Sequence, residues 1–367
     1  MVDKKLLKNV DYVLVICVYI VAAIGILAIS SATHVKENGS YSSVIKQALS
    51  LAIGTVAFIL LMSMDYSYLN GYSKYIYIAN IIILLMVAVV GHVSKGAQSW
   101  ISLGFFNLQP SEFAKVACII TLSKFLSERD GPLDNAHDVL MIMMNVGIPF
   151  VIIFVQPDLG TALVFVAITL GMLFVYGIEK KFILAGGSAV AVSMPIIWFY
   201  ALKPHQRNRI ITFINPSRDP LKTGYHAIQS KIAVGSGMLT GRGLYNGTQT
   251  QLNFLPEART DFIFSVVGEE LGFIGAAIVV LLYLIILYRI IKIAARAKDK
   301  FGMYLCVGVA AMFLFQIFEN IGMTIGLMPI TGITLPFMSY GGSSLLANLI
   351  ALGIVISVGM RRQKINF

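Results

Sequence analysis

Acidic side chains crowd the start of one apolar run, in a chain where charge is otherwise scarce. The stretch LPEARTDFIFSVVGEELGFIG, residues 255–275, contains Asp261, Glu269 and Glu270. A carboxylate at the edge of such a run can accept a proton or bind a cation. In a helix, Glu269 lies about 12 Å beyond Asp261 on the same side, and Glu270 points nearly opposite. We therefore interpret Glu270 as structural, leave Glu269 open, and take Asp261 as the candidate for chemistry.

Other apolar runs also begin with polar motifs: LQPSEFAK, QPDLGTA and MSYGGSS. Ser, Thr and Asp are residue types that cap helix N-termini. Capping is the simplest interpretation of Ser111, Asp158, Thr260 or Asp261, and Ser343.

Capping does not account for Glu112 and Lys115. Their spacing of three places them on one helical face, where they can form an ion pair. Within a membrane, such a pair is expected to face the bundle interior or a water-filled cavity. There it could bind a substrate or lock two helices together.

A long loop, residues 202–260, carries further candidates for binding. The segment HQRNRIITFINP sets Arg207 and Arg209 among apolar residues, and GYHAIQSKIAVGSGM, which contains Gln229, is amphipathic. Both segments are predicted to lie at a membrane surface. The glycines around Arg242 predict a mobile backbone that approaches a ligand closely. No strand precedes them, which disfavours a dinucleotide-binding motif, and the alternative is a solvated connector.

The composition is that of a membrane protein, with 57% hydrophobic and 13% charged residues over 367 positions. A helix needs about 20 apolar residues to span a bilayer. Ten such runs predict an all-α membrane protein: a single domain over residues 1–367, a polytopic bundle of ten transmembrane helices with a large extracellular loop, residues 202–260, between helices 7 and 8. The runs are 11–31, 44–64, 75–92, 110–126, 140–155, 158–178, 182–201, 262–291, 302–326 and 343–360.

Lys and Arg residues predict the orientation, because short cytoplasmic loops collect them. Placing both termini in the cytoplasm puts most of the basic residues outside the long loop on the inner side, and the polar motifs face outward. The net charge of +10 is then mostly a topology signal, so nucleic-acid binding need not be invoked. Four helix N-termini at the outer face would favour an anionic ligand such as a phosphate.

Cys17, Cys118 and Cys306 all fall in apolar runs, with no disulfide framework or metal-ligand spacing.

The motifs QPSEFAK (109–115), QPDLGTA (156–162), GTQTQLNFLPEARTDFIFSVVGEELGFIG (247–275) and TGITLPFMSYGGSS (331–344) resemble those of the shape, elongation, division and sporulation family of bacterial cell-wall polymerases. The resemblance covers nearly the whole chain, and the long motif is highly specific. GTQTQ before LPEARTDF is more similar to members that act in rod-shaped elongation than to division members, with a sporulation member as the alternative. Arg259 departs from the family pattern, since many members carry histidine there, so a cationic role survives and an imidazole role does not.

The resemblance implies a peptidoglycan glycosyltransferase that polymerises lipid II, the undecaprenyl-pyrophosphate-linked disaccharide pentapeptide. It would act at the outer face of the bacterial cytoplasmic membrane during cell elongation. Family members work with a class B penicillin-binding protein as transpeptidase, and elongation members also with MreC and MreD.

The family motif indicates that Asp261 is the general base on the acceptor 4-hydroxyl. Alternatively, Asp261 holds a divalent cation, Mg²⁺ or Mn²⁺, against the pyrophosphate. Candidates for binding the leaving group are Lys115, Arg207, Arg209 and Arg242, with Glu112 orienting Lys115. Asp158 is expected to shape the cavity, and the remaining candidates for contact with the substrate are Gln229, Arg259, Thr260 and Ser343.

Two other functions stay open at this stage. A flippase for the lipid-linked precursor would need polar residues along the whole transmembrane path, whereas the polar residues here cluster outward. A non-catalytic scaffold of the synthase complex would tolerate Asp261→Asn.

Overall fold

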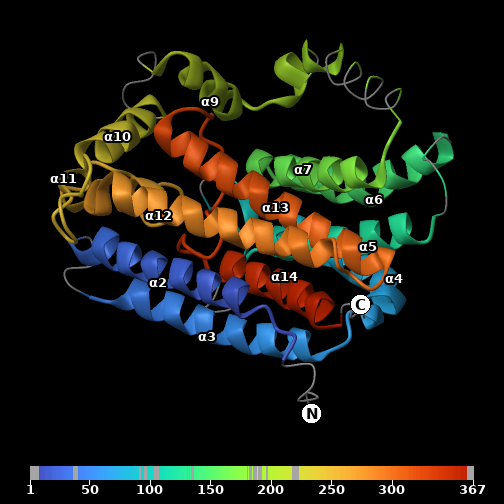
Figure 1. The fold of residues 1–367 in the computed structure, drawn as a ribbon. Coiled ribbons are helices and arrows are strands. Elements are labelled where there is room, and N and C mark those ends of the chain that lie inside the picture. The colour runs from blue at the N-terminus through green and yellow to red at the C-terminus, as the bar shows by residue number, and fades with distance from the viewer. Residues whose placement is uncertain are drawn as a thin grey trace.

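The computed structural model describes residues 8–35, 40–90, 92–94, 97–102, 107–129, 131, 133, 136–179, 181, 184, 188, 192–195, 197–216 and 223–361. Long helices run roughly side by side through most of the molecule (Figure 1). A small antiparallel sheet, which the sequence did not predict, lies between α4 and α5 with the strand order β1-β2-β3. In chain order the elements are α2 Tyr12–His34, α3 Ser42–Ser63, α4 Ser67–Val90, β1 His92–Ser94, β2 Ala97–Ser102, β3 Asn107–Leu108, α5 Pro110–Ser127, α6 Ala136–Val155, α7 Leu159–Tyr176, the π-helix η1 Ile197–Ala201, α9 Pro204–Ile214, α10 Thr223–Ser236, α11 Thr248–Gln251, α12 Ile263–Ala294, α13 Lys300–Ile325 and α14 Gly342–Met360.

The all-α membrane fold predicted from the sequence is confirmed. Among the described residues, 8 helices are long and apolar enough to cross a membrane. Helix α5 is not among them, because it carries three charged residues, Glu112, Lys115 and Lys124. Each predicted run except 182–201 coincides with a helix, and nine of the twenty residues of that run lie outside the described residues. The count of ten spans and the single-domain division therefore remain predictions.

Helix α4 begins at Ser67, earlier than the predicted start at residue 75. The backbone N–H of Ser67 donates to Asp65 Oδ1 at 2.9 Å, which starts the helix with a side-chain cap. The first turns, SYLNGYSKY, are polar and aromatic, so hydropathy alone places the start too late.

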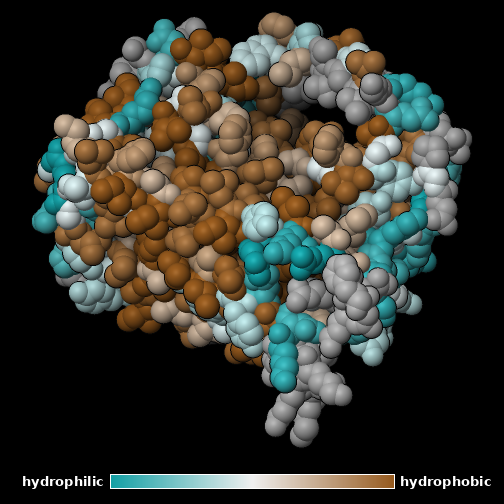
Figure 2. Space-filling model, in the orientation of Figure 1, coloured by the Kyte–Doolittle hydropathy of each residue, from teal (hydrophilic) through white to brown (hydrophobic). Residues whose placement is uncertain are grey.

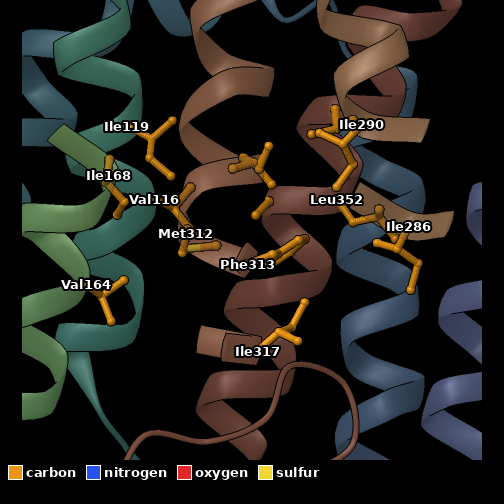
Figure 3. Packing of buried hydrophobic residues seen from close by; sticks show 14 of the residues in the cluster. Val116, Ile119, Val164, Ile168, Ile286, Ile290, Met312, Phe313, Ile317 and Leu352 are labelled. Atoms are coloured by element: carbon orange, nitrogen blue, oxygen red, sulfur yellow. The ribbon is translucent and has the colours of Figure 1, made fainter. Parts of the chain in front are cut away.

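The core lies around α13 and α14. Helix α13 packs against α12, α7 and α5, and α14 packs mainly on α3. Figure 3 shows the contacts at close range, with Met312 and Phe313 of α13 between Val116 of α5 and Leu352 of α14. On the outside, hydrophobic side chains cover the middle of the visible face, and hydrophilic ones gather toward its edges (Figure 2). This distribution matches a bundle that meets lipid around its waist.

Helix α12 is broken near its start by Gly272, whose φ of 66° and ψ of −165° are not helical. The backbone groups that the break frees pair with a loop from residues 238–243: Phe273 N donates to Met238 O at 2.8 Å, and Gly243 N donates to Glu270 O at 3.0 Å. A Cβ at Gly272 would lie 2.2 Å from Gly241 N, so only glycine permits this approach.

The glycine-rich segment was expected to approach a ligand. The close approach that the structure contains is instead to α12, since a Cβ at Gly241 would lie 2.1 Å from Glu270 O. The two segments predicted to lie at the membrane surface are helical, α9 and α10. Helix α10 packs on both α12 and α13, so its buried face belongs to the bundle.

Candidate active site

The N-terminal ends of α5, α7 and α14 meet at one end of the bundle, joined through Gln109. Its backbone N–H donates to Ser343 Oγ at 3.0 Å, and its side-chain Nε2 donates to Asp158 Oδ2 at 3.3 Å. The residues before α12 reach the same end, because Ser339 Oγ donates to Thr260 O at 2.7 Å. The four polar helix starts singled out in the sequence are therefore neighbours. We call this region the site end.

Asp261 lies in the turn that precedes α12 and is half-buried. Its carbonyl oxygen accepts a hydrogen bond from Asn320 Nδ2 at 3.0 Å, and the same Nδ2 donates to Ile333 O at 2.7 Å. One amide of α13 thus ties Asp261 to the segment Thr331–Ile333, which we call the site strand.

The side chain of Asp261 lies against the middle of the site strand. A Cβ at Gly332 would lie 3.5 Å from Asp261 Oδ2, and Gly332 has a φ of +82°. The site strand also packs on the first turn of α7, since a Cβ at Gly160 would lie 3.0 Å from Thr331 O. The carboxylate and the start of α7 therefore both lie against the same three residues.

The ion pair predicted between Glu112 and Lys115 is confirmed. Lys115 Nζ lies 2.8 Å from Glu112 Oε2, and Lys115 and Glu112 are only 1% and 5% exposed. Burial deprives an ammonium of its hydration, and a carboxylate in contact with it offsets part of that cost. This pair places a compensated cation in the first turns of α5, at the site end.

Asp158 caps α7 as predicted, since Oδ1 accepts from Thr161 N at 3.1 Å. Burial raises the pKa of the Asp158 carboxyl above its ordinary value, against the hydrogen bonds from Thr161. The Glu112 carboxylate raises this pKa further, and the Lys115 ammonium lowers it. Asp158 therefore shares one electrostatic neighbourhood with the buried pair.

The predicted cap at Ser111 is wrong. Pro110 takes the first helical position and Gln109 the N-cap, which is a common place for proline because its missing N–H is not needed there. Ser111 consequently lies inside α5, with its Oγ buried and without a hydrogen-bond partner among the described residues.

The caps predicted at Ser343 and at Thr260 or Asp261 are also wrong. Gly341 is the N-cap of α14, so the Ser343 hydroxyl is free to donate to Asn107 O at 2.9 Å. The N-cap of α12 is Phe262, without a side-chain hydrogen bond. Thr260 Oγ1 instead donates within the turn, to Glu257 Oε2 at 3.2 Å.

The candidate arginines fall into separate places. Arg209 Nη1 donates to Thr331 O at 2.8 Å, which brings α9 to the site strand. Arg207 donates to Leu202 O at 3.0 Å and Phe199 O at 2.8 Å, which anchors it to its own segment. Arg242 is exposed and donates to Ser236 O at 3.2 Å. Of these three, Arg209 is the one that the structure connects to the neighbourhood of Asp261.

Arg259 contacts two other elements of the site end. Its Nη1 donates to Ser43 Oγ at 2.7 Å, and its guanidinium lies 4.8 Å from the ring centroid of Tyr340. The cationic role predicted for this position is compatible with both contacts. Gln229 lies half-buried on α10, and its role in binding remains a prediction.

Glu269 and Glu270 point to different partners, as their helical positions predicted. Glu269 Oε1 accepts from Gln249 N at 2.7 Å, at the start of α11. Glu270 accepts from the hydroxyl of Ser31 on α2. Neither contact involves Asp261. We therefore interpret Glu269, whose role the sequence left open, as an anchor for the loop that contains α11.

Sequence reasoning missed Asn320 and Glu319, and it gave the site strand no role beyond its place in the motif TGITLPFMSYGGSS. A glutamate and an asparagine side by side in the apolar run QIFENIGM were the available signal. Within the described residues, no group of three or more His, Cys, Asp or Glu side chains could hold a metal ion. A divalent cation at Asp261 would have to draw its other ligands from backbone carbonyls, water or the substrate.

Comparisons with known proteins identify the family of the chain. The family model described as "Cell cycle protein", for FtsW, RodA and SpoVE, matches residues 11–364. "Peptidoglycan glycosyltransferase MrdB" of Escherichia coli (strain K12) is 39% identical over 316 residues, which cover 86% of this chain and 85% of the relative. "Stage V sporulation protein E" of Bacillus subtilis (strain 168) is 38% identical over 356 residues, with coverage of 95% and 96%.

Solved structures are similar over nearly the full length. A chain from a peptidoglycan synthase complex, described as coordinating polymerization and crosslinking, superposes with a TM-score of 0.81 at 32% identity, covering 95% of this chain and 97% of that chain. The rod shape determining protein RodA of Thermus thermophilus superposes with a TM-score of 0.73 at 28% identity, covering 97% and 98%. The protein therefore belongs to the FtsW, RodA and SpoVE family of polytopic membrane proteins.

Proposed function

We propose that the site end polymerises lipid II, with Asp261 as the general base. That the chain is a peptidoglycan glycosyltransferase follows from its family and from relatives that carry this name. The proposal concerns the substrate, the residues and their roles. The observation that carries it is the Asp261 carboxylate beside the site strand, where the starts of α5, α7, α12 and α14 come together.

The reaction joins the 4-hydroxyl of one saccharide to the anomeric carbon of another. The hydroxyl oxygen forms a bond to the anomeric carbon, the bond from that carbon to the lipid pyrophosphate breaks, and the Asp261 carboxylate takes the hydroxyl proton. Aspartate carboxylates are ionised at neutral pH and weakly basic. A weak base suffices when proton transfer is late and the sugar already resembles an oxocarbenium ion.

The departing pyrophosphate needs positive charge nearby. Lys115 supplies a buried ammonium, and Glu112, 2.8 Å away, fixes its position. Arg209 is the second candidate, because one of its nitrogens already donates to Thr331 O in the site strand. We assign Asp158, Arg259 and Ser343 to shaping the site, since each contacts a second segment at the site end.

We place the site end on the extracytoplasmic side of the bacterial cytoplasmic membrane, with both termini inside. The distribution of Lys and Arg supports this orientation. A transpeptidase of the class B penicillin-binding type is the proposed partner, and MreC and MreD would complete the assembly in elongation. The similar chain from a synthase complex that couples polymerization to crosslinking supports a transpeptidase partner.

The test gives purified protein fluorescent lipid II, with and without its transpeptidase partner, and separates the products by size. We expect glycan ladders from the wild type and none from Asp261→Ala or Asp261→Asn. Asp65→Asn is the matched control, because Asp65 lies between α3 and α4, away from the site end, and its loss should leave the ladders intact.

Ladders from Asp261→Asn as long and as fast as those of the wild type would refute the assignment of Asp261 as the base. Ladders that appear only with added Mg²⁺ or Mn²⁺ would favour Asp261 as a cation ligand over Asp261 as the base. The two roles differ in whether polymerisation depends on a divalent cation, so one assay separates them.

A further inference from the structure

Glu319 is a buried carboxylate that the mechanism above does not use. We propose that it is a positioning residue for the reaction, acting through Thr331 to hold the site strand against Asp261. This inference rests on the proposed role of the site end in lipid II polymerisation. It adds a second acid to the site without making that acid a proton acceptor.

The contact between Glu319 and Thr331 joins α13 to the site strand. Thr331 Oγ1 donates to Glu319 Oε1 at 2.7 Å, and Glu319 is 3% exposed. A carboxylate that accepts a hydrogen bond in a buried place binds more strongly than a neutral acceptor. The bond therefore fixes both the hydroxyl and the start of the site strand.

The next residue of α13 holds the other end of the same strand. Asn320 Nδ2 donates to Ile333 O at 2.7 Å and to Asp261 O at 3.0 Å. Glu319 and Asn320 thus fasten the first and last residues of a three-residue segment, and its middle residue, Gly332, lies against the Asp261 carboxylate. Freedom at either end would change the distance between the strand and that carboxylate.

Thr331 also connects the strand to a candidate cation. Its carbonyl oxygen accepts from Arg209 Nη1 at 2.8 Å, while its hydroxyl is committed to Glu319. The side chain thus faces α13 and the main chain faces α9. Loss of the Glu319 contact would loosen the position of the Arg209 guanidinium together with the surroundings of Asp261.

The experiment measures polymerisation kinetics in the full-length protein with its partner. Glu319→Ala and Thr331→Val should each lower kcat by about tenfold, the factor expected for one lost buried hydrogen bond. The double variant Glu319→Ala/Thr331→Val should be no slower than the slower single variant, because both remove the same contact. Glu319→Gln and Thr331→Ser keep an acceptor and a hydroxyl and should recover most of the activity.

Thr324→Val is the matched control for Thr331→Val. Thr324 is also buried, and its Oγ1 donates within its own helix, to Ile321 O at 2.7 Å. We expect near wild-type activity from this variant. Amide hydrogen exchange gives a readout besides activity: exchange at Thr331, Gly332 and Ile333 should rise in Glu319→Ala and Thr331→Val, and not in Thr324→Val.

Full activity and unchanged exchange in Glu319→Ala would overturn the proposal. So would a double variant whose loss is the product of the two single losses. Loss of all activity in Glu319→Gln would also overturn it, because the charge itself would then be required in the chemistry. Asp261→Asn, measured alongside, tests the base independently. Full activity of this variant would refute the assignment of Asp261 as the base. The coupling between Glu319 and Thr331 would still be decided by the comparison of the two single variants with the double variant.

Discussion

Glu269 Oε2 accepts two hydrogen bonds from Thr250, one from its backbone N–H at 3.1 Å and one from its hydroxyl at 2.7 Å. Glu269 is fully buried, and its other oxygen accepts from Gln249 N. One carboxylate on α12 therefore caps the short helix α11 and fixes the loop that leads to Asp261.

Replacing this carboxylate should loosen the loop. Glu269→Ala leaves buried N–H donors unsatisfied, at a cost of about 1–3 kcal/mol in the free energy of unfolding. Thermal unfolding of the detergent-solubilised protein should show a clear decrease in Tm. Glu128→Gln, which removes an exposed carboxylate 3.7 Å from Lys124, should change Tm little. Equal Tm values for the two variants would show that the cap contributes nothing.

Gly272 should tolerate no side chain. Its positive φ strains any other residue by about 1–3 kcal/mol, and a Cβ would in addition lie 2.2 Å from Gly241 N. We expect Gly272→Ala to separate the 238–243 loop from α12, which faster amide exchange at Arg242 and Gly243 would report. Gly235→Ala is the control, since a Cβ there meets nothing within 4 Å. Unchanged exchange in Gly272→Ala would mean that the loop is held by other contacts.

Local patterns predicted the parts of this fold that depend on neighbours in sequence. Apolar runs of membrane-spanning length predicted the helices, the spacing of Glu112 and Lys115 predicted their pair, and the Pro-Asp start of QPDLGTA predicted the cap at Asp158. In each case the partner lies within four residues, so the sequence contains the whole interaction.

Contacts between distant segments could not be predicted in this way. The end of a helix and a turn lie between Glu319 and Thr331 in the sequence. Arg209 and Thr331 are 122 residues apart. The glycines near Arg242 indicated close approach, but only the fold identifies α12 as what they approach. The caps at Ser111 and Ser343 failed because a nearby Pro110 or Gly341 shifted the helix start by a residue or two.

The buried Glu112–Lys115 pair offers a test that separates stability from catalysis. Lys115→Met leaves a buried carboxylate without its partner, which should cost about 3–5 kcal/mol in the free energy of unfolding. The double variant Glu112→Leu/Lys115→Met removes both charges and should recover most of that stability. Thermal unfolding and the lipid II assay are measured on the same preparations.

If Lys115 serves the leaving group, the double variant stays inactive although it is stable. Recovery of polymerisation together with stability would instead show that the pair only stabilises the fold. The single variant cannot distinguish these roles, because a destabilised protein also loses activity.

Asp158 should make stability depend on pH, with a sign that follows from its pKa. Burial raises the pKa of this carboxyl in the folded protein above its ordinary 3.8. In the folded protein, Asp158 therefore keeps its proton to a higher pH than in the unfolded chain. The stability of the folded protein falls as pH rises from the ordinary pKa of Asp158 through its pKa in the folded protein. Asp158→Asn keeps an oxygen for the cap at Thr161 N and removes the titration. The difference in Tm, wild type minus Asp158→Asn, should decrease as pH rises above the ordinary pKa of the carboxyl.

Asp65 supplies a control of opposite sign. Burial alone would raise the pKa of Asp65, but hydrogen bonds from Ser67 and the charges of Arg361 and Lys298 together lower it. Its contribution to stability is present above the ordinary pKa and is lost as pH falls through the folded one. The difference in Tm, wild type minus Asp65→Asn, should therefore increase as pH rises over the acidic range. If the Tm difference for Asp158→Asn also increased with pH, as that for Asp65→Asn should, the raised pKa of Asp158 would be contradicted. Thr161 and Lys115 would then stabilise the Asp158 carboxylate more than burial opposes it.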